Sequence, residues 1–366
     1  MSKRLIGCIA LALAALPAAP LPAQETSDPL RIVLVDVEGG AAALYITPEG
    51  RSLLIDTGWP TGVGGPRPEP GKPAPVPLNS AERIVAAARA AGLTKIDYLV
   101  MSHYHVDHVG GVEDLLKTFP VGTVIDHGPN REMPPEGANP AMLRFATATL
   151  YPAYLKAIEG HEHRVMKAGD TLAIDGLDLT AVVSDRKVIA APAGAGANDA
   201  CASATSKAQD GGEENARSLG FLMRWGKARL LAAADTSWNV ENELACPQNR
   251  IAPVDLYIAD NHASEISNSP AFVNSIAPRV VLFQNGPRKG ADASVFETVR
   301  AAPRHEALWQ MHTAERAAKH NEPPQRIANL AGGTDGHPLS VYVARDGAIT
   351  IVNPRTGHSE TYPAGK

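Results

Sequence analysis

The segment 103–108, with the sequence His-Tyr-His-Val-Asp-His, places four metal-binding side chains within six residues. It directly follows a run of apolar residues that predicts a buried strand. Side chains two residues apart point the same way on extended backbone, so we expect His103 and His105 to serve one metal. Asp107 and His108 stand where the chain turns into a predicted helix, and we expect them to serve a second metal. Imidazole and carboxylate ligands suit Zn²⁺, and Mn²⁺ or Fe²⁺ also fit them.

Four apolar runs of the chain each end in a polar residue. They lead into Asp56, His103, Asp235 and the triplet Asp260-Asn261-His262. Any one of these residues alone could be a turn former, because Asp and Asn are common where strands end. Four buried strands that end in this way predict one cleft at one edge of the sheets.

The 103–108 segment and the Gly-Gly that follows it resemble the signature of the metallo-β-lactamase superfamily. Residues 35–40 and 53–58 resemble the first hairpin of that superfamily. Segments further along resemble the hydrolase domain of bacterial competence (DNA-uptake) proteins more than they resemble true lactamases; they are 214–219, 230–235, 260–264 and 269–272. The resemblance implies an α/β (α+β) chain, an αββα sandwich of two mixed sheets with helices outside.

The resemblance also implies roles for particular residues. Asp235 would bridge both metals, and His262 would complete the second one. Asp56 would orient a ligating His and fix its tautomer, with a plain turn carboxylate as the alternative. Asp107 and Asp235 are the predicted catalytic residues, because both would hold a hydroxide in line with the substrate.

The sequence departs from the lactamase pattern at the first metal. Lactamases supply a third His there, whereas the matching place holds Asn215, a residue shared with competence-type domains. Asn215 could offer a carbonyl oxygen or only shape the turn. Substitute ligands on paper are His127, which ends a predicted strand, His161 and His163. For each of them the alternative is a position at the surface or behind a ligand. A further departure is Ala263 after His262, where the superfamily commonly has Gly.

A second polar loop follows the predicted strand 279–283 and should emerge at the same edge. It contains Asn285, Arg288 and Lys289. The two cations could clamp an anionic group of the substrate. The alternative is a solvated charged loop. The remaining His residues, His312 among them, show no ligand spacing and are expected at the surface.

Residues 1–23 read as a signal peptide, with a positive start, an apolar stretch and small residues for cleavage. Residues 24–366 would then form one metallo-β-lactamase-like domain, with a Pro-rich insertion at 60–77 and a C-terminal helical and hairpin elaboration at 291–366. The predicted location is periplasmic or secreted, without stable membrane association after cleavage. Cleavage would change the net charge from −5 to −7, which disfavours non-specific nucleic-acid binding.

Cys201 and Cys246 remain after the predicted cleavage, and an even pair in an exported chain predicts a disulfide. Two buried free thiols are the alternative. The sequence contains neither a Gly-x-Ser-x-Gly elbow nor a phosphate-binding Gly-x-x-x-x-Gly-Lys loop, so a serine hydrolase and a nucleoside triphosphatase lack support.

Together these patterns predict an exported hydrolase with one or two Zn²⁺ ions in a binuclear-type site. We expect its substrate to be a phosphodiester, either a small molecule or a short nucleic acid. One alternative is a lactonase or β-lactamase that opens a cyclic ester or amide. Another is a weakly active metal-binding protein.

Overall fold

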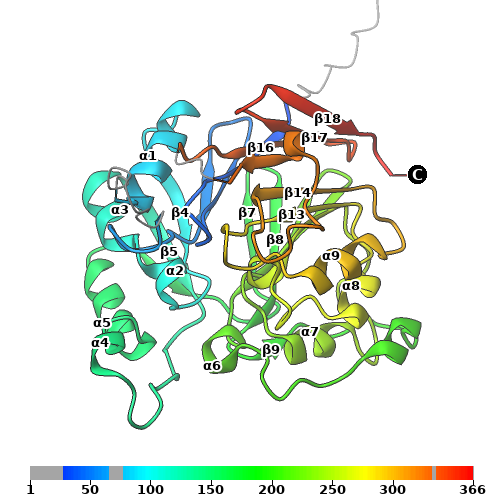
Figure 1. Ribbon diagram of the computed structural model, residues 1–366, viewed down its shortest axis with the longest axis horizontal. Helices are drawn as coiled ribbons and strands as arrows, with labels where there is room; N and C mark the ends of the chain where they lie inside the picture. The colour runs from blue at the N-terminus through cyan, green and yellow to red at the C-terminus, as the bar shows by residue number, and fades with distance from the viewer. Residues whose placement is uncertain (1–27, 66–76, 332–334, 366) are drawn as a thin grey trace, which may run out of the picture.

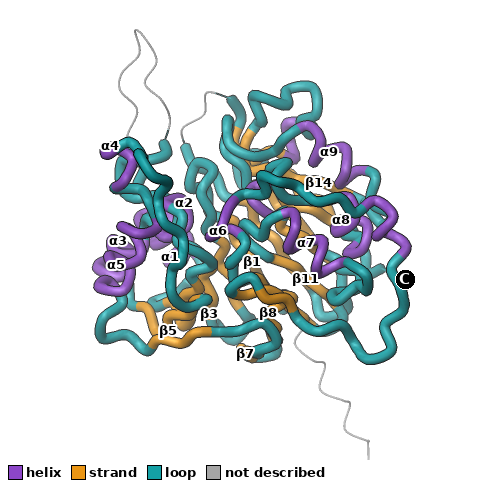
Figure 2. Tube along the Cα trace, turned by 90° about the horizontal axis from the view of Figure 1, so that it is seen from below, coloured by secondary structure: helices purple, strands orange, loops and turns teal. Residues whose placement is uncertain are grey.

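The computed structural model describes residues 28–65, 77–331 and 335–365. The predicted signal peptide and most of the Pro-rich insertion lie outside these residues. Two mixed β-sheets pack face to face, and helices cover the outer side of each sheet (Figures 1 and 2). The predicted αββα sandwich is therefore confirmed.

The first sheet has the strand order β18-β17-β16-β1-β2-β3-β4-β5-β6. Strands β3 to β6 run parallel to one another, and the other pairings are antiparallel. Its strands are β1 (Leu30–Leu34), β2 (Ala43–Ile46), β3 (Ser52–Ile55), β4 (Ile96–Val100), β5 (Val121–Asp126), β6 (His163–Val165), β16 (Leu339–Val343), β17 (Ile349–Asn353) and β18 (His358–Tyr362).

The second sheet has the order β15-β14-β13-β12-β11-β10-β8-β7, with β9 paired to β8. Strands β11 to β15 are parallel. Its strands are β7 (Thr171–Ile174), β8 (Leu177–Ser184), β9 (Lys187–Val188), β10 (Gly220–Trp225), β11 (Ala228–Ala232), β12 (Leu256–Ile258), β13 (Val280–Phe283), β14 (Ala307–His312) and β15 (Ile327–Asn329).

The helices divide between the two outer faces. Side chains of α1, α3 and α5 pack on the first sheet, and those of α7, α8 and α9 pack on the second. The α-helices are α1 (Ser80–Ala90), α2 (Val106–Val109), α3 (Val112–Thr118), α4 (Pro140–Leu143), α5 (Thr147–Ala157), α6 (Gly212–Asn215), α7 (Trp238–Ala245), α8 (Pro270–Ile276) and α9 (Ala293–Arg300). Short 3₁₀ turns are η1 (Asp199–Ser203), η2 (Asp260–Ala263) and η3 (Pro324–Arg326).

Helix α1 shows how local sequence sets an element. The Asn79 side chain accepts a hydrogen bond from the Glu82 backbone N–H at 3.0 Å, which satisfies one of the free donors at the helix start. Ile84, Val85 and Ala88 form its buried face. The cap and the apolar face together account for the start of the helix and for the side that packs on the sheet.

The main core lies between the two sheets. It includes Tyr45 from the first sheet and Trp225 and Trp309 from the second, all of them buried. Truncating a buried aromatic of this kind to Ala costs about 3–5 kcal/mol. Packing in this core sets the position of one sheet relative to the other, and so brings their polar strand ends to the same edge.

The chain from 291 onward contributes to both sheets. Strands β14 and β15 extend the second sheet, and the predicted hairpin appears as β16 and β17 in the first. Strand β16 pairs with β1, with Leu30 opposite Val343. Residues 140–157 form two helices, α4 and α5, and the long connection between β9 and β10 contains η1 and α6.

The predicted helix after the metal loop is also divided, into α2 and α3. A Cβ on Gly110 would lie 2.2 Å from Pro60 Cδ, and a Cβ on Gly111 would lie 2.2 Å from the Thr57 carbonyl oxygen. The glycine pair therefore allows the loop after β3 to pack directly against the metal loop.

Two further sequence predictions concern cysteines and membranes. Cys201 and Cys246 form a disulfide with Cα atoms 5.7 Å apart, as predicted. Within 28–65, 77–331 and 335–365, no helix has the length and apolar character needed to cross a bilayer.

Candidate metal centre

Polar strand ends from both sheets meet at one edge of the sandwich. Asp56 follows β3 and His103 follows β4, and these strands are parallel neighbours in the first sheet. Asp235 follows β11 and His262 follows β12, which are parallel neighbours in the second sheet. All four side chains are buried.

Four of the predicted ligands form a tight group. Asp107, His108, Asp235 and His262 each offer a ligand atom, and these atoms all lie within 4.8 Å of one another. His108 Nε2 is 3.2 Å from Asp107 Oδ2 and 3.3 Å from Asp235 Oδ1. His262 Nε2 is 3.1 Å and 3.5 Å from the same two oxygens. Two imidazoles and two carboxylates converging on one point suit Zn²⁺, and they are the set expected for the second metal.

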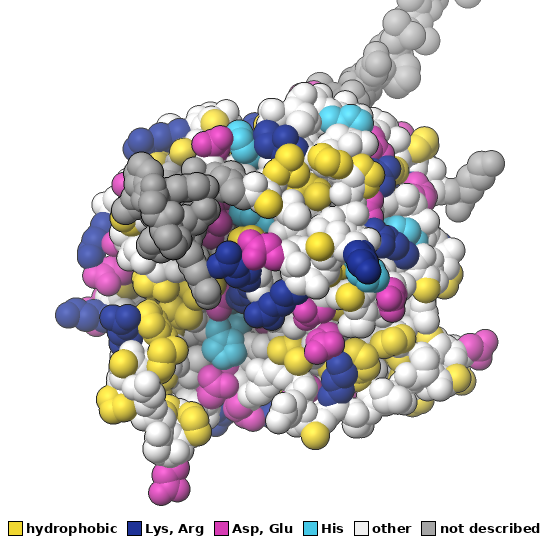
Figure 3. All heavy atoms as spheres, in the orientation of Figure 1, with side chains coloured by type: hydrophobic (Ala, Val, Ile, Leu, Met, Phe, Trp, Pro, Cys, Tyr) yellow, Lys and Arg dark blue, Asp and Glu magenta, His cyan; other side chains and the backbone are white. Residues whose placement is uncertain are grey.

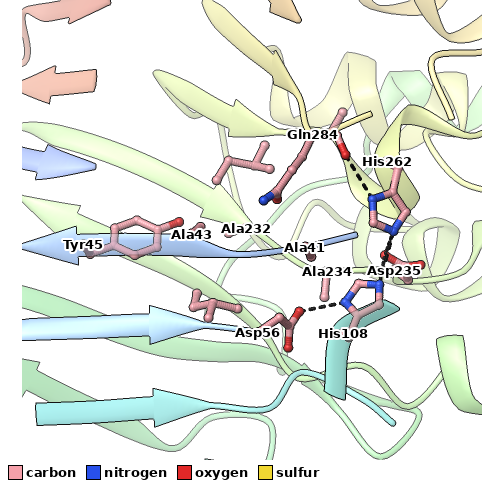
Figure 4. Close-up of a pocket in the computed structure, with 13 residues that line it drawn as sticks. Ala41, Ala43, Tyr45, Asp56, His108, Ala232, Ala234, Asp235, His262 and Gln284 are labelled. Atoms are coloured by element: carbon pink, nitrogen blue, oxygen red, sulfur yellow. Dashed lines mark hydrogen bonds and ion pairs between the residues drawn. The ribbon is translucent and has the colours of Figure 1, made fainter. Parts of the chain in front are cut away.

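Asp56 orients the two His residues of the first sheet. Its Oδ2 accepts a hydrogen bond from His108 Nδ1 at 2.8 Å (Figure 4). The same oxygen accepts from Ser102 Oγ at 2.7 Å. The Ser102 hydroxyl oxygen can in turn accept from His103 Nδ1, 3.0 Å away. Both imidazoles then carry their proton on Nδ1 and turn Nε2 toward the cluster. A carboxylate behind a ligating His is the arrangement that fixes its tautomer.

His262 is oriented by backbone instead. Its Nδ1 lies 3.0 Å from the Gln284 carbonyl oxygen, which can accept its proton (Figure 4). Asn261 and His262 both have a positive φ, at 50° and 54°. This conformation is uncommon for residues other than glycine, and it turns the His262 side chain back toward Asp235.

His103 and His105 form a second, more open pair beside the four-residue cluster. His103 Nε2 lies 3.1 Å from His105 Nδ1 and 4.0 Å from Asp235 Oδ2. His105 Nε2 lies 3.3 Å from Glu132 Oε2, and Glu132 also accepts from Thr147 Oγ1 at 3.2 Å. Glu132 thus orients the His105 ring through Nε2 and leaves Nδ1 facing His103, as Asp56 orients the ring of His108.

The short helix α6 braces this part of the loop. Glu214 Oε1 accepts from the Tyr104 backbone N–H at 2.9 Å and lies 3.0 Å from His127 Nε2. His127 is therefore buried against Glu214. Asn215 is also buried, and its Oδ1 has no hydrogen-bond partner among the described residues. This carbonyl oxygen is the atom that the sequence analysis offered as an oxygen ligand.

The polar residues of the loop after β13 contact other protein groups, whereas the sequence analysis expected Arg288 and Lys289 to clamp an anion. Asn285 is buried and donates to the His312 and Gly286 carbonyl oxygens. Arg288 pairs with Glu315 at 2.7 Å. The Lys289 ammonium donates to Asp107 Oδ2 and lies 3.0 Å from His262 Nε2. Lys289 therefore lies within the ligand cluster.

The electrostatics of the cluster favour a cation. Burial would raise the pKa of Asp107 and Asp235, but Lys289 and His108 respectively are the largest opposing causes, and each carboxyl pKa lies well below its usual range. Burial lowers the pKa of His108, yet Asp235 and Asp107 outweigh it and raise that pKa well above the usual value. For His103, burial and His108 lower the pKa well below the usual value, so this imidazole is neutral.

A small cavity lies between the sheets next to the cluster. Its volume is about 30 Å³, and alanines from both sheets line much of it, with Asp56, His108, Asp235 and His262 at one end (Figure 4). Ligand pockets for small molecules measure about 300–1,000 Å³. This cavity is too small for a substrate of that size. Charged and His side chains gather near the centre of the face that Figure 3 shows.

A third group of acids and imidazole lies nearby but differs in character. Asp36, Glu38 and His312 are all buried. Arg83 Nη1 pairs with Asp36 at 2.9 Å and with Glu38 at 3.5 Å, and His312 pairs with Asp36 at 2.7 Å. His312 and Arg83 therefore already balance Asp36, whereas burial and the Asp36 charge raise the pKa of Glu38. The expectation that His312 is a surface residue was wrong, because it ends the buried strand β14.

Sequence reasoning missed three residues that act on the cluster: Ser102, Glu132 and Gln284. Ser102 could have been noticed as a hydroxyl directly before the first ligand. Glu132 lies in a loop after β5, a neighbour of β4, so an acid there was a candidate for the same edge. Gln284 acts through its backbone carbonyl, which has no sequence signal.

The sequence model of the metallo-beta-lactamase superfamily matches residues 36–183. No protein of curated function matches the sequence. Among solved structures, the metallo-beta-lactamase fold protein YhfI from Bacillus subtilis is similar, with 11% identity, a TM-score of 0.41 and coverage of 77% of this chain and 97% of that one.

Two further solved structures are similar. Tm1679, a metal-dependent hydrolase of the beta-lactamase superfamily, shares 13% identity, with a TM-score of 0.44 and coverage of 77% of this chain and 95% of that one. CmlA, a diiron beta-hydroxylase from Streptomyces venezuelae, shares 15%, with a TM-score of 0.36 and coverage of 70% of this chain and 45% of that one. The chain thus spans less than half of CmlA.

The family match covers the first sheet's parallel strands and the 103–108 loop. With the two mixed sheets and their outer helices, it defines a metallo-β-lactamase fold. The described residues thus combine this fold with candidate metal-binding residues at one edge of the sandwich.

Proposed function

We propose that the protein is an exported, metal-dependent hydrolase with a binuclear-type site, and that it cleaves a phosphodiester. The observation that carries the proposal is the buried cluster of Asp107, His108, Asp235 and His262. Buried carboxylates and imidazoles within 4.8 Å of one another are costly unless a cation joins them. His103 and His105 would hold the other metal, with the Asn215 oxygen as a weak third ligand.

The chain's own residues can orient a hydrolytic reaction. A bound divalent metal would lower the pKa of a water toward neutrality and so supply the nucleophile. Asp107 and Asp235 are both ionised, so each can accept a hydrogen bond from that water and hold it in one direction. Asp56 and the Gln284 carbonyl keep His108 and His262 in the tautomer that leaves Nε2 free for the metal.

The substrate class rests on charge and on the Asn215 turn. Asn215 stands where the lactamase pattern has His, and competence-type domains share it. Lys289 adds a cation at the cluster, and its side chain is 35% exposed, so it can also face a bound anion. The acidic body disfavours long duplex DNA, so a small phosphodiester or a short nucleic acid fits best.

Export is the other part of the proposal. The Cys201–Cys246 disulfide supports an oxidising compartment, since such bonds are rare where the cytosol keeps thiols reduced. The apolar start of the chain reads as a signal for the same route.

A substrate panel tests the proposal. Purified protein is loaded with Zn²⁺, Mn²⁺ or Fe²⁺ and given bis-aryl phosphodiesters, short oligonucleotides, lactones and β-lactams. We expect turnover of the phosphodiesters, lost in Asp107→Ala and on chelation. If only lactones or β-lactams are turned over, the phosphodiester assignment is wrong and the substrate is a cyclic ester or amide. Metal binding without any turnover would favour the metal-binding protein.

A further inference from the structure

We propose that the Lys289 ammonium is an internal cation that competes with the second metal for Asp107 and His262. The proposal rests on the metal site of the proposed function, and it adds a residue that regulates how that site fills. The conclusion follows from what Lys289 contacts, from how its loop is held, and from the contacts that a metal needs.

The ammonium lies among the ligand atoms of the four-residue cluster. Lys289 Nζ donates to Asp107 Oδ2 and lies 3.0 Å from His262 Nε2. The same two atoms lie 3.1 Å from each other, and both also approach the other members of the cluster. A lysine that only lined the rim of the cleft would not reach the inward-facing nitrogen of a predicted ligand.

The loop that carries Lys289 is fixed to the metal site. Gly286 N–H donates to the Lys289 carbonyl at 3.0 Å, which closes a tight turn, and Ala291 N–H donates to the His262 carbonyl at 2.9 Å. A Cβ on Gly290, which has φ +68°, would lie 1.9 Å from that His262 oxygen. Only glycine permits this approach. The backbone contact at Gly290 therefore holds the neighbouring Lys289 beside His262.

An ammonium and a divalent metal cannot share these partners. A zinc ligand gives its lone pair to the metal at about 2.0–2.2 Å, which leaves no room for a lysine proton on the same nitrogen. Lys289 must therefore leave before the second metal enters. Its side chain is 35% exposed, so it has a route to solvent, and Trp59 lies 5.2 Å away as a ring face for the displaced cation.

The competition concerns the second metal alone. In the described residues, the contacts of Lys289 are to Asp107, His262 and Trp59, and none is to His103 or His105. We therefore expect sequential filling, in which one metal binds readily and the second binds weakly while Lys289 is present. The lysine released by the second metal would then stand at the cleft as a positive group for an anionic substrate.

The test is a zinc titration of the full chain, followed by calorimetry and by metal analysis after desalting. Lys289→Met keeps the length and the apolar stem and removes the charge. Arg288→Met is the matched control, because the neighbouring cation pairs with Glu315 outside the cluster. We expect Lys289→Met to bind the second zinc at least about tenfold more tightly than the wild type, and Arg288→Met to match the wild type.

Thermal unfolding gives a second readout that needs no activity. With chelator, Lys289→Met should unfold at a lower temperature than the wild type, because Asp107 loses its counter-ion. With excess zinc the difference should close, because zinc displaces the lysine from the same contacts in the wild type. Lys289→Gln serves as a second neutral variant if the Met variant does not fold.

The outcomes separate the two proposals. Equal zinc affinities in the wild type and both Lys289 variants would overturn the competition and leave the metal site standing. No zinc binding by any variant would remove the metal site, and the proposed function with it. Tighter binding by Arg288→Met as well would show that net charge alone is responsible, and would also overturn the competition.

Discussion

Asp56→Asn is the substitution that most sharply tests how the site is oriented. In the wild type, Asp56 Oδ2 accepts from both His108 Nδ1 and Ser102 Oγ, while Oδ1 accepts from the Ser102 backbone N–H. An Asn can keep the bond to the Ser102 backbone through its oxygen. Its NH₂ group then faces His108 and must donate, so His108 changes tautomer and turns a protonated Nε2 toward the cluster.

The size of the effect follows from these bonds. Replacing a carboxylate that orients a ligating His weakens metal binding by about 10–100-fold. Hydrogen bonds to a charged group contribute about 1.5–3 kcal/mol each, but the new tautomer restores a donor and acceptor match. We therefore expect the free energy of unfolding without metal to fall by only about 1–3 kcal/mol. The loss of metal affinity should exceed what the loss of stability explains.

The assay is a zinc competition with a coloured chelator, paired with urea unfolding in EDTA. Asp97→Asn is the matched control. Asp97 is also buried, and its Oδ2 accepts from the Ser52 N–H at 3.0 Å and from Ser52 Oγ at 3.3 Å, but it begins β4, at the strand end away from His103. It should lose stability and keep wild-type zinc affinity. Wild-type affinity in Asp56→Asn, or an equal loss in both variants, would refute the reasoning.

Three further predictions concern other parts of the molecule. Replacing Cys201 and Cys246 by Ala should lower the free energy of unfolding by about 3–4 kcal/mol, measured in urea, because the bond closes a loop of sequence separation 45; reduction of the wild type with no loss would contradict this. Glu132→Gln should weaken the first zinc by about tenfold in the same chelator assay, since it frees His105, and an unchanged first zinc would argue against it.

The third concerns pH and the buried pair of Asp36 and His312. Burial opposes both charges, but each partner outweighs it, so the pKa of Asp36 is lowered from 3.8 and the pKa of His312 is raised from 6.5. The pair's stabilisation should be full between those values, decline as the pH falls through the folded Asp36 pKa, and decline as it rises through the folded His312 pKa. His312→Gln should flatten the high-pH decline in urea unfolding, and an identical profile would exclude this role.

The sequence predicts those site residues that lie close together along the chain or directly follow a strand. The spacing within 103–108 and the apolar runs that lead into Asp235 and His262 were enough to predict that ligands from both sheets meet at one edge. Four apolar runs likewise predicted the strands β3, β4, β11 and β12. These signals depend on side-chain type and period, which a single sequence contains.

Features that depend on long-range contacts were not accessible. The pairing of β16 with β1 joins residues at opposite ends of the described chain, and no local pattern marks it. Glu132 reaches His105 from a separate loop, and the Gln284 carbonyl reaches His262 through backbone alone. For Lys289 the predicted edge is right, but the direction of the side chain depends on the turn at Gly286 and on the close approach of Gly290 to His262.

Anomalous diffraction from crystals grown with zinc tests the central claim most directly. Data collected on either side of the zinc absorption edge locate the metal independently of activity. The proposed metal centre predicts a peak about 2.0–2.2 Å from His108 Nε2, His262 Nε2 and a carboxylate oxygen of Asp235, with another peak beside His103 and His105. Zinc peaks elsewhere on the protein, with none at this cluster, would contradict it.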